Sequence, residues 1–183
     1  MKKFVFVFLC LLSCTNKNFF SFSPETAEGT LFSFEPLKET TASVFVFLSP
    51  DCPLSENYTL PIRQLNEKFS KHGIKLFAVF PGRHCDKDEI KKFAEEFQLQ
   101  IPLLADRDRE LLNFFDASIT PEAFVVNQKG EIVYSGSIDN GYASLGKKRE
   151  VITEYYLEDA LNALLSGTEI KIKKTEAVGC FIE

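Results

Sequence analysis

The chain has 183 residues, 45% of them hydrophobic, and a formal net charge of −5 at pH 7. This length suffices for one well-buried core. The mildly acidic balance, without a basic stripe, excludes the usual electrostatics of nucleic-acid binding, so we expect no nucleic-acid partner.

An export signal is predicted at the N-terminus. Lys2 and Lys3 precede an apolar stretch, residues 4–12, that is too short to span a bilayer. This stretch ends in Leu11-Leu12-Ser13-Cys14, which resembles a bacterial lipobox. The resemblance implies cleavage after Ser13 and lipid attachment to Cys14. An ordinary secretory signal with incidental cysteines is the alternative.

We therefore expect three parts: a lipoprotein-type signal peptide at residues 1–13, a tether at 14–30, and one domain at 31–183 that ends in a cysteine-bearing tail. The lipid anchor would hold the domain at a membrane of the cell envelope, facing the periplasm or the exterior. Besides Cys10 and Cys14, the chain has three further thiols, and an odd number cannot all pair within one exported chain.

The first half of the domain alternates strands with a helix. Residues 31–40 are expected to add a short edge strand, and the β-branched and aromatic run at 43–48 a buried strand. Apolar residues at helical spacing predict a helix over 56–71. Pro61 falls inside this helix, and Gly73 marks its end.

The second half continues the alternation and ends in a hairpin and a helix. Asp86 is a candidate N-cap for a helix that runs to about Phe97. The other predicted elements are strands at 74–80, 101–104, 122–127 and 131–136, and helices at 109–115 and 153–165. This order predicts an α/β fold with a central mixed sheet, parallel strands first and an antiparallel pair last, and helices on both faces.

The candidate nucleophile is Cys52, where the 43–48 strand gives way to the next helix. Pro53 suits the first turn of a helix, where its missing N–H costs nothing. The thiol therefore lies at a helix N-terminus, whose free N–H groups and dipole favour the thiolate. The neighbouring carboxylate of Asp51, if close, would oppose this by raising the pKa of Cys52.

Four segments carry a family resemblance. They are Ser49-Pro50-Asp51-Cys52-Pro53, Thr120-Pro121-Glu122-Ala123-Phe124-Val125, Tyr134-Ser135-Gly136-Ser137-Ile138-Asp139 and Val178-Gly179-Cys180. Across residues 40–182 the chain resembles the thioredoxin-like redoxins, also called the alkyl hydroperoxide reductase/thiol-specific antioxidant family, and within it the exported bacterial members. The resemblance implies a thioredoxin-like fold in which the Thr120-Pro121 bond is cis and Pro121 faces Cys52.

Two departures from the family bear on the activity. Ser55 replaces the second cysteine of the thioredoxin Cys-x-x-Cys motif, so Cys52 cannot form the usual local disulfide; its hydroxyl could donate to the thiolate or simply sit on the first helical turn. The peroxidatic motif Pro-x-x-x-Thr-x-x-Cys has Phe45 and Ser49 at its first two fixed positions, and no arginine lies between 110 and 148. This weakens a peroxidase assignment.

A second thiol must resolve the intermediate that Cys52 forms with a disulfide or a peroxide. The candidates are Cys180, in a tail that Gly179 is expected to leave flexible, Cys85, and an external thiol. Two-cysteine redoxins often use a distant C-terminal cysteine, so the resemblance favours Cys180. Cys85 is the rival because it follows the second strand at the same carboxyl edge of the sheet as Cys52.

Two features near these cysteines have simpler interpretations. His84 and Cys85 provide too few ligands for a closed metal site, so we expect no metal and no other cofactor. The loop at 139–150, with Asp139 and Tyr142, could form one wall of the active cleft or be a solvated connection.

The sequence thus predicts an extracytoplasmic thiol-disulfide oxidoreductase acting on exported proteins that carry thiols or disulfides. Its nucleophile would be Cys52, with Cys180 or, as substitute, Cys85 as the resolving thiol. The substrate groove would include Pro53, Ser55, Thr120 and Pro121. A thiol peroxidase acting on small hydroperoxides is the second hypothesis. A redox-inactive binding module is the third, because position 55 lacks the second thiol.

Overall fold

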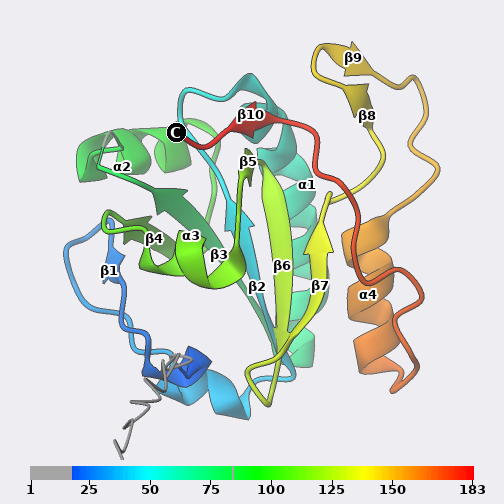
Figure 1. Cartoon of the computed structure of the whole chain (residues 1–183), viewed down its shortest axis with the longest axis horizontal. Coiled ribbons are helices and arrows are strands. Elements are labelled where there is room, and N and C mark those ends of the chain that lie inside the picture. Colours follow the sequence, from blue (N-terminus) through cyan, green and yellow to red (C-terminus); the bar gives the residue numbers. More distant parts are fainter. Residues whose placement is uncertain (1–17, 84) are drawn as a thin grey trace, which may run out of the picture.

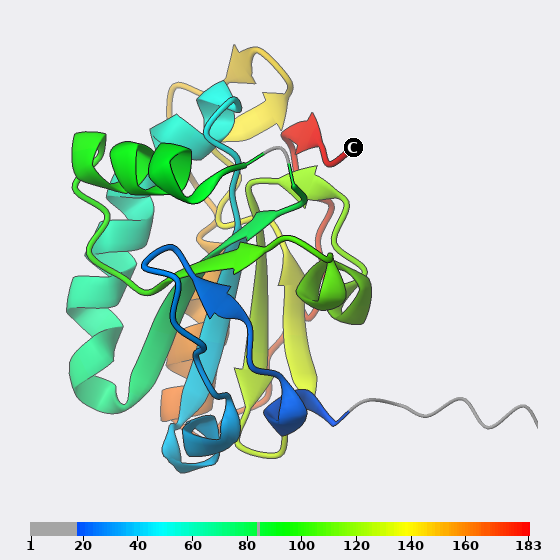
Figure 2. The same ribbon diagram turned by 90° about the vertical axis from the view of Figure 1, so that its left-hand side faces the viewer.

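The computed structural model describes residues 18–83 and 85–183 (Figure 1). The predicted signal peptide, the lipidation site Cys14 and His84 lie outside the described residues. A six-stranded mixed sheet lies between two layers of helices, as the side view in Figure 2 shows.

The sheet has the strand order β1-β4-β3-β2-β6-β7. Its central strands, β2 (Ala42–Phe47) and β3 (Ile74–Pro81), are parallel, and β4 (Leu103–Asp106) continues the parallel part. The antiparallel hairpin of β6 (Glu122–Asn127) and β7 (Ile132–Gly136) lies on the other side of β2. The predicted α/β fold, with parallel strands first and an antiparallel pair last, is confirmed.

Helices α1 (Pro53–Phe69), α2 (Lys87–Glu96) and α4 (Tyr156–Leu165) cover one face of the sheet (Figure 2). Val44 and Val46 point to this face because alternate residues of a strand share a side. They belong to a core cluster to which all three helices contribute.

The opposite face is packed with phenylalanine. Phe45 and Phe47 of β2 point to it, next to α3 (Glu110–Phe115) and the N-terminal segment. Phe45 stacks on Phe77 of β3, with ring centroids 5.0 Å apart and an interplanar angle of 9°. Burial of these rings on one face of β2, and of Val44 and Val46 on the other, fixes the strand that leads to Cys52.

Local sequence signals set the ends of two elements. Asp86 caps α2 in a capping box, in which its carboxylate accepts from the Asp88 and Glu89 amides while the Glu89 carboxylate accepts from the Asp86 amide. After α1 the chain makes the short 3₁₀ helix η3 (Ser70–His72) and ends it at Gly73, whose φ is +75°.

The described part of the expected tether, residues 18–30, is folded into the domain. The 3₁₀ helix η1 (Phe19–Ser21) brings Phe19 and Phe20 into the phenylalanine-rich core, and β1 (Glu25–Thr26) pairs with β4. The edge strand expected at 31–40 is wrong. A 3₁₀ helix, η2 (Glu35–Glu39), forms there because a proline occupies its first turn, and β1 takes the edge position.

The C-terminal segment is docked, in contrast to the expected flexible tail. We call residues 173–183 the C-terminal strap. At its start it runs beside β7, where the Ser135 amide donates to the Lys173 carbonyl at 3.0 Å. At its end, β10 (Cys180–Phe181) pairs antiparallel with β5 (Ile119–Thr120), as Figure 1 shows.

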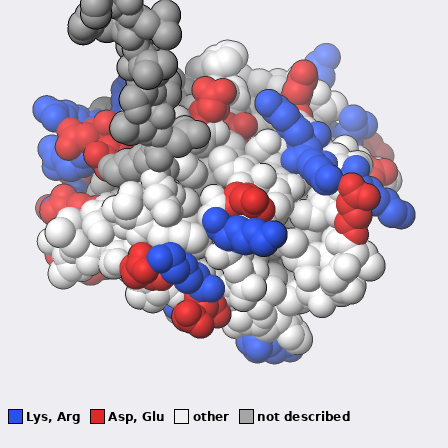
Figure 3. Space-filling model, turned by 60° about the horizontal axis from the view of Figure 1, so that its bottom comes forward, with Lys and Arg blue, Asp and Glu red and all other residues white. Residues whose placement is uncertain are grey.

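The predicted loop at 139–150 contains a small hairpin, β8 (Tyr142–Ser144) and β9 (Lys147–Lys148). Among the described residues, no helix is both long and apolar enough to cross a bilayer. On the face shown in Figure 3, basic and acidic side chains are interspersed instead of forming a basic stripe.

Candidate functional site

Cys52 occupies the N-cap position of α1. Its backbone is extended (φ −99°, ψ 111°), Pro53 is the first helical residue, and the Glu56 amide donates to the Cys52 carbonyl at 3.3 Å. The sequence prediction of a thiol at the start of this helix is therefore confirmed. The residue is 1% exposed, so the sulfur is shielded from bulk solvent.

The Thr120-Pro121 peptide bond is cis, as the family resemblance implies. Thr120 lies against the candidate nucleophile: the Cys52 thiol donates to the Thr120 carbonyl, with 3.1 Å between Sγ and O. The sheet brings these residues together because β2 and β6 are hydrogen-bonded neighbours, with Phe47 opposite Glu122.

Hydrogen bonds offset the cost of ionising Cys52 in a buried place. Burial alone would raise the pKa of this thiol, but hydrogen bonds from Cys180, from the Thr120 side chain, and from the Ser55 amide and hydroxyl outweigh it. The net direction is downward from the ordinary value of 9.0. The Ser55 amide belongs to the first turn of α1, so the expected contribution of the helix N-terminus is present.

Ser55 has two roles at this corner. Its side chain is fully buried, and its oxygen accepts from the Ser49 amide at 3.1 Å. Its hydroxyl proton is therefore available to the Cys52 sulfur, in line with the lowered pKa of that thiol. Ser55 thus lies on the first turn of α1, and donation of its hydroxyl to the thiolate stays a prediction.

Cys180 is brought to the candidate nucleophile. In the β10–β5 pair it lies opposite Thr120, and it lines the same pocket as Cys52, close enough for each thiol to shift the pKa of the other. Burial, followed by the hydrogen bond with Cys52 and its charge, raises the pKa of Cys180 to about 11. Cys180 therefore keeps its proton at neutral pH and can donate it to Cys52 once that thiol has ionised. Both cysteines are in the free, reduced form.

Gly179 permits this close approach. A Cβ at Gly179 would lie 2.0 Å from the Thr120 carbonyl oxygen and 2.6 Å from its carbonyl carbon. Because both are backbone atoms inside a paired strand, no side-chain movement could relieve the clash. The glycine thus determines how closely the strap packs against β5.

Cys85 has a separate environment. It is 2% exposed and hydrogen-bonded to Ser49, and burial, followed by the carboxylates of Asp51 and Glu89, raises its pKa to about 11. Asp51, which the sequence placed as a possible opponent of Cys52 ionisation, thus raises the pKa of Cys85. Part of the rise at Cys180 comes from the Cys52 charge and is lost once Cys52 is in a mixed disulfide, whereas Cys52 contributes nothing to the rise at Cys85. Cys85 is therefore the poorer nucleophile for the second exchange.

The cysteine pair lines a pocket of about 430 Å³, whose wall includes Asp51, Thr120 and the last residues of the strap. Arg109 also lines it, and its guanidinium donates to the Glu183 carbonyl. Arg109 was not predicted as a site residue, because it lies just before the 110–148 range that lacks arginine. Its position depends on a left-handed backbone (φ +58°) at the N-cap of α3, which no short motif announces.

A buried hydrogen-bonded pair fixes the 139–150 loop beside the site. The Tyr58 hydroxyl of α1 donates to Asp139 Oδ1 at 2.6 Å, and the Gly141 amide donates to the same oxygen at 2.7 Å. Burial, followed by the hydrogen bond to Asp139, raises the pKa of Tyr58. Tyr58, Asp139 and Tyr142 line a small recess with Pro121, so the loop forms a wall near the site.

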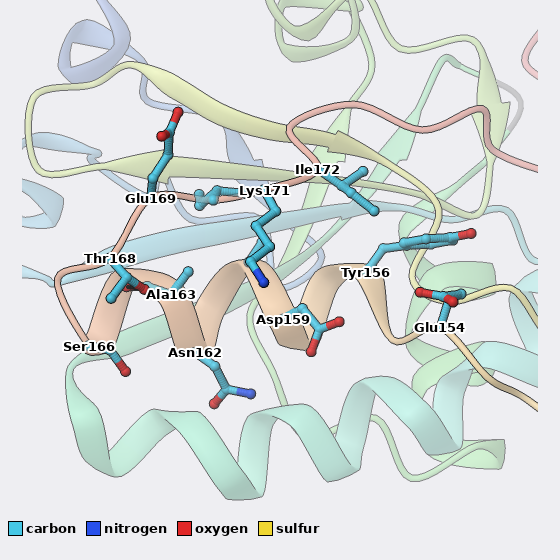
Figure 4. Close-up of a pocket in the computed structure, with 12 residues that line it drawn as sticks. Glu154, Tyr156, Asp159, Asn162, Ala163, Ser166, Thr168, Glu169, Lys171 and Ile172 are labelled. Carbon is cyan, nitrogen blue, oxygen red and sulfur yellow. Dashed lines mark hydrogen bonds between the residues drawn. The ribbon is translucent and has the colours of Figure 1, made fainter.

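A second pocket, of about 450 Å³, lies between α4 and the segment that follows it (Figure 4). Asp159, Asn162 and Lys171 are among the residues that line it, and no cysteine does. Across residues 18–83 and 85–183, no group of three or more potential metal ligands comes together.

Comparison with curated proteins identifies partial relatives. Over 71 residues the chain is 31% identical to the thiol-disulfide oxidoreductase ResA of Geobacillus kaustophilus (strain HTA426), which covers 39% of this chain and 40% of the relative. ResA of Bacillus subtilis (strain 168) is 29% identical over 65 residues, covering 36% and 35%. The matches therefore span about two fifths of the length of these relatives.

Solved structures agree with the fold along most of the chain. The crystal structure of an uncharacterized conserved protein from Geobacillus kaustophilus has a TM-score of 0.79 at 24% identity, covering 88% of this chain and 87% of that one. A structure of MTB dsbF, in mixed oxidized and reduced forms, has a TM-score of 0.62 at 18% identity and covers 81% and 98%. The fold is thioredoxin-like.

The sequence assigns the chain to one family among those that share the thioredoxin-like fold. The AhpC/TSA family model matches residues 15–135, a stretch that contains Cys52, Ser55 and the cis Thr120-Pro121 bond. This match spans well over half of the chain, and the protein belongs to the AhpC/TSA family.

Proposed function

We propose that this protein is a thiol-disulfide oxidoreductase that uses Cys52 as nucleophile and Cys180 as resolving thiol. One observation carries the proposal: the β10–β5 pair sets Cys180 opposite Thr120, whose carbonyl accepts the Cys52 thiol at 3.1 Å, and both cysteines line the same pocket. The pKa of Cys52 lies below its ordinary value and that of Cys180 above it. This difference supports Cys52 as the attacking thiol.

The reaction needs two exchanges. The Cys52 thiolate attacks one sulfur of a substrate disulfide, a mixed disulfide forms, and the other substrate sulfur leaves as a thiolate. Cys180 then loses its proton and attacks the Cys52 sulfur, which releases the second substrate thiolate and forms the Cys52–Cys180 disulfide. The substrate gains two electrons and the cysteine pair loses two. An external dithiol must reduce the pair before the next cycle.

The substrate groove is formed around Pro53, Ser55, Thr120 and Pro121 in this proposal. The curated relatives are named thiol-disulfide oxidoreductases, which supports proteins with thiols or disulfides as partners. The proposed location rests on the lipobox-like segment Leu11-Leu12-Ser13-Cys14. A lipid on Cys14 would hold the domain in the cell envelope, outside the cytoplasm.

Mass mapping of disulfides tests the pairing. The purified, reduced protein is oxidised with a limiting amount of diamide, which takes up the two electrons and two protons of one dithiol, and is then alkylated and digested. We expect a Cys52–Cys180 link in the wild type and in a Cys85→Ala variant, and none in Cys180→Ala. A dominant Cys52–Cys85 link would assign the resolving role to the rival thiol. An oxidised protein in which Cys52 forms no link would refute the proposal.

A thiol peroxidase is the second candidate, favoured by one observation: Arg109 lines the same pocket as Cys52, where a guanidinium could polarise a small hydroperoxide. Stopped-flow oxidation of Cys52 by hydrogen peroxide and by an alkyl hydroperoxide measures this activity. A rapid reaction that Arg109→Gln slows, with disulfide exchange unchanged, would favour the peroxidase. A slow reaction that needs millimolar peroxide would favour the oxidoreductase.

A further inference from the structure

The C-terminal strap lies where a second polypeptide must bind to reach Cys52. In the β10–β5 pair, Cys180 is opposite Thr120 and Phe181 is opposite Ile119, directly before the cis proline. The Ile182 amide donates to the Ser118 carbonyl at 2.9 Å and extends this ladder by one bond. With the strap docked, the nucleophile is almost completely buried. Residues 180–183 also line the pocket that Cys52 shares, so a protein substrate that approached through this pocket would meet the strap.

We propose that the end of the strap occupies the binding site of a segment of the partner protein. An extended segment of the partner protein binds to the edge of Ile119–Thr120 in place of residues 179–183, and it presents its own cysteine sulfur where the Cys180 thiol lies. The inference rests on the proposed exchange chemistry at Cys52, and it adds to it the kind of segment that is recognised. Pairing of a guest strand with an exposed strand edge is a general mode of peptide binding.

The sequence of the strap shows what such a segment must contain. The residue before the cysteine has to be glycine, because any Cβ there would meet the Thr120 carbonyl oxygen at 2.0 Å. The residue after the cysteine is free to vary, since Phe181 is 83% exposed. The next position is apolar, because Ile182 packs against the phenylalanine-rich core. The preferred partner segment is therefore Gly-Cys-x-apolar.

The attachment of the strap allows its end to leave separately. Its start is held to β7 and the adjoining turn by Ser135, Ser137 and Thr175, with the Ser137 amide donating to Thr175 Oγ1 at 2.8 Å. Its end is held by a two-residue strand and by Arg109, which donates to the Glu183 carbonyl. Because these are separate groups of contacts, residues 179–183 can detach while residues 173–176 remain docked.

Displacement of the end of the strap by the partner segment is compatible with the order of the two thiol-disulfide exchanges. The partner disulfide binds at β5, Cys52 attacks the sulfur that follows glycine, and the other partner sulfur leaves as a thiolate. When the end of the strap returns, Cys180 attacks the Cys52 sulfur and releases the partner cysteine as a thiolate. The strap is thus both competitor and resolving arm.

The test uses the full chain with Cys180→Ser, which leaves no resolving thiol on the strap. Three disulfide probes react with Cys52: the small 2,2′-dipyridyl disulfide, and pyridyl disulfides of two peptides that contain Gly-Cys-Phe-Ile or Ala-Cys-Phe-Ile. Adding Gly179→Ala should displace the end of the strap, because the new Cβ clashes with β5. Adding Glu176→Gln is the matched control, since this side chain is exposed on the same strap.

We expect Gly179→Ala to speed the reaction of the glycine peptide about tenfold or more, because a larger fraction of the protein then has a free edge. The control should react like its parent, and the alanine peptide should stay about tenfold slower than the glycine peptide on every variant. A chain that ends at Val178 serves as a second open form should Gly179→Ala fold poorly.

Equal rates for the two peptides would overturn the inference, and so would the absence of acceleration in both open forms. In either case, rapid reaction of Cys52 with the small disulfide would leave the proposed function intact. Absence of reaction between Cys52 and all three probes would overturn the proposed function itself, and this inference with it.

Discussion

Cys180 faces Thr120 across the β10–β5 pair, although 60 residues separate them in the chain. The same threonine accepts the Cys52 thiol through its carbonyl group at 3.1 Å. One backbone position of β5 thus aligns two sulfur atoms that are far apart in the sequence. The predictions below examine what each neighbour contributes to this arrangement.

Removal of the Cys180 thiol should raise the pKa of Cys52. Cys180→Ala deletes a donor to the thiolate, whereas Cys180→Ser keeps a hydroxyl that can donate. The pH dependence of alkylation at Cys52, followed by mass mapping, measures this. We expect a higher pKa in the alanine variant than in the serine variant. Identical curves would show that Cys180 does not stabilise the thiolate, and an unperturbed wild-type thiol, near 8.5, would favour the redox-inactive module.

A second cysteine at position 55 should redirect the disulfide. Ser55 is buried on the first turn of α1, and its amide and hydroxyl lower the pKa of Cys52, so the sulfur of a Ser55→Cys variant would lie next to that of Cys52. We expect mass mapping after oxidation to find a link between Cys52 and position 55 in competition with the Cys180 link. In the Ser55→Ala control, the link to Cys180 should persist and the pKa of Cys52 should rise. Failure of the new thiol to pair would contradict this geometry.

The Tyr58–Asp139 hydrogen bond should contribute to stability. Tyr58→Phe removes the donor at 2.6 Å from a buried carboxylate and leaves that oxygen with the Gly141 amide alone. We expect a loss of about 1–3 kcal/mol in the free energy of unfolding, measured by urea denaturation. Tyr155→Phe is the matched control, because Tyr155 is 48% exposed, and should change stability by less than about 0.5 kcal/mol. Equal effects of the two changes would contradict the prediction.

Alkaline pH should lower the free energy of unfolding of the reduced protein, because the Cys85 thiol ionises. Its folded pKa of about 11 exceeds the ordinary value of 9.0, so the folded state holds the proton more tightly than the unfolded chain. The resulting stabilisation is complete below pH 9 and is lost as the pH rises through 11, up to about 3 kcal/mol in all. Urea unfolding with a reductant at pH ~8 and ~10.5 should show this fall, and a shallower one in Cys85→Ala. An equally steep fall in the variant would show that other groups cause it.

Sequence patterns predicted the elements whose signals are local. Asp86 caps α2, Pro53 begins α1 and Gly73 ends the turn after it, because each acts through its own backbone or its near neighbours. The position of Cys52 follows from the same kind of signal. The family resemblance supplied the cis Thr120-Pro121 bond, which periodicity alone does not predict.

The remaining features depend on contacts between distant segments. Phe19 and Phe20 have no helical or alternating pattern around them, and only the phenylalanine-rich face of the sheet accounts for their burial. The two-residue strand β10 exists only through its pairing with β5, so a tail with one glycine gave no sign of it. Arg109 enters the pocket from a left-handed backbone position that its neighbours in sequence do not encode.

The distribution of aromatic chromophores follows from the two-sided core. The protein has no tryptophan and five tyrosines, of which four lie in or against the core beneath α1 and α4 and none lies in the phenylalanine-rich cluster. Intrinsic emission therefore reports on one side of the sheet only. Tyr134 is 3.0 Å from Thr175 Oγ1 at the start of the strap. Its emission would change if the whole strap came away, and stay constant if only the last residues did.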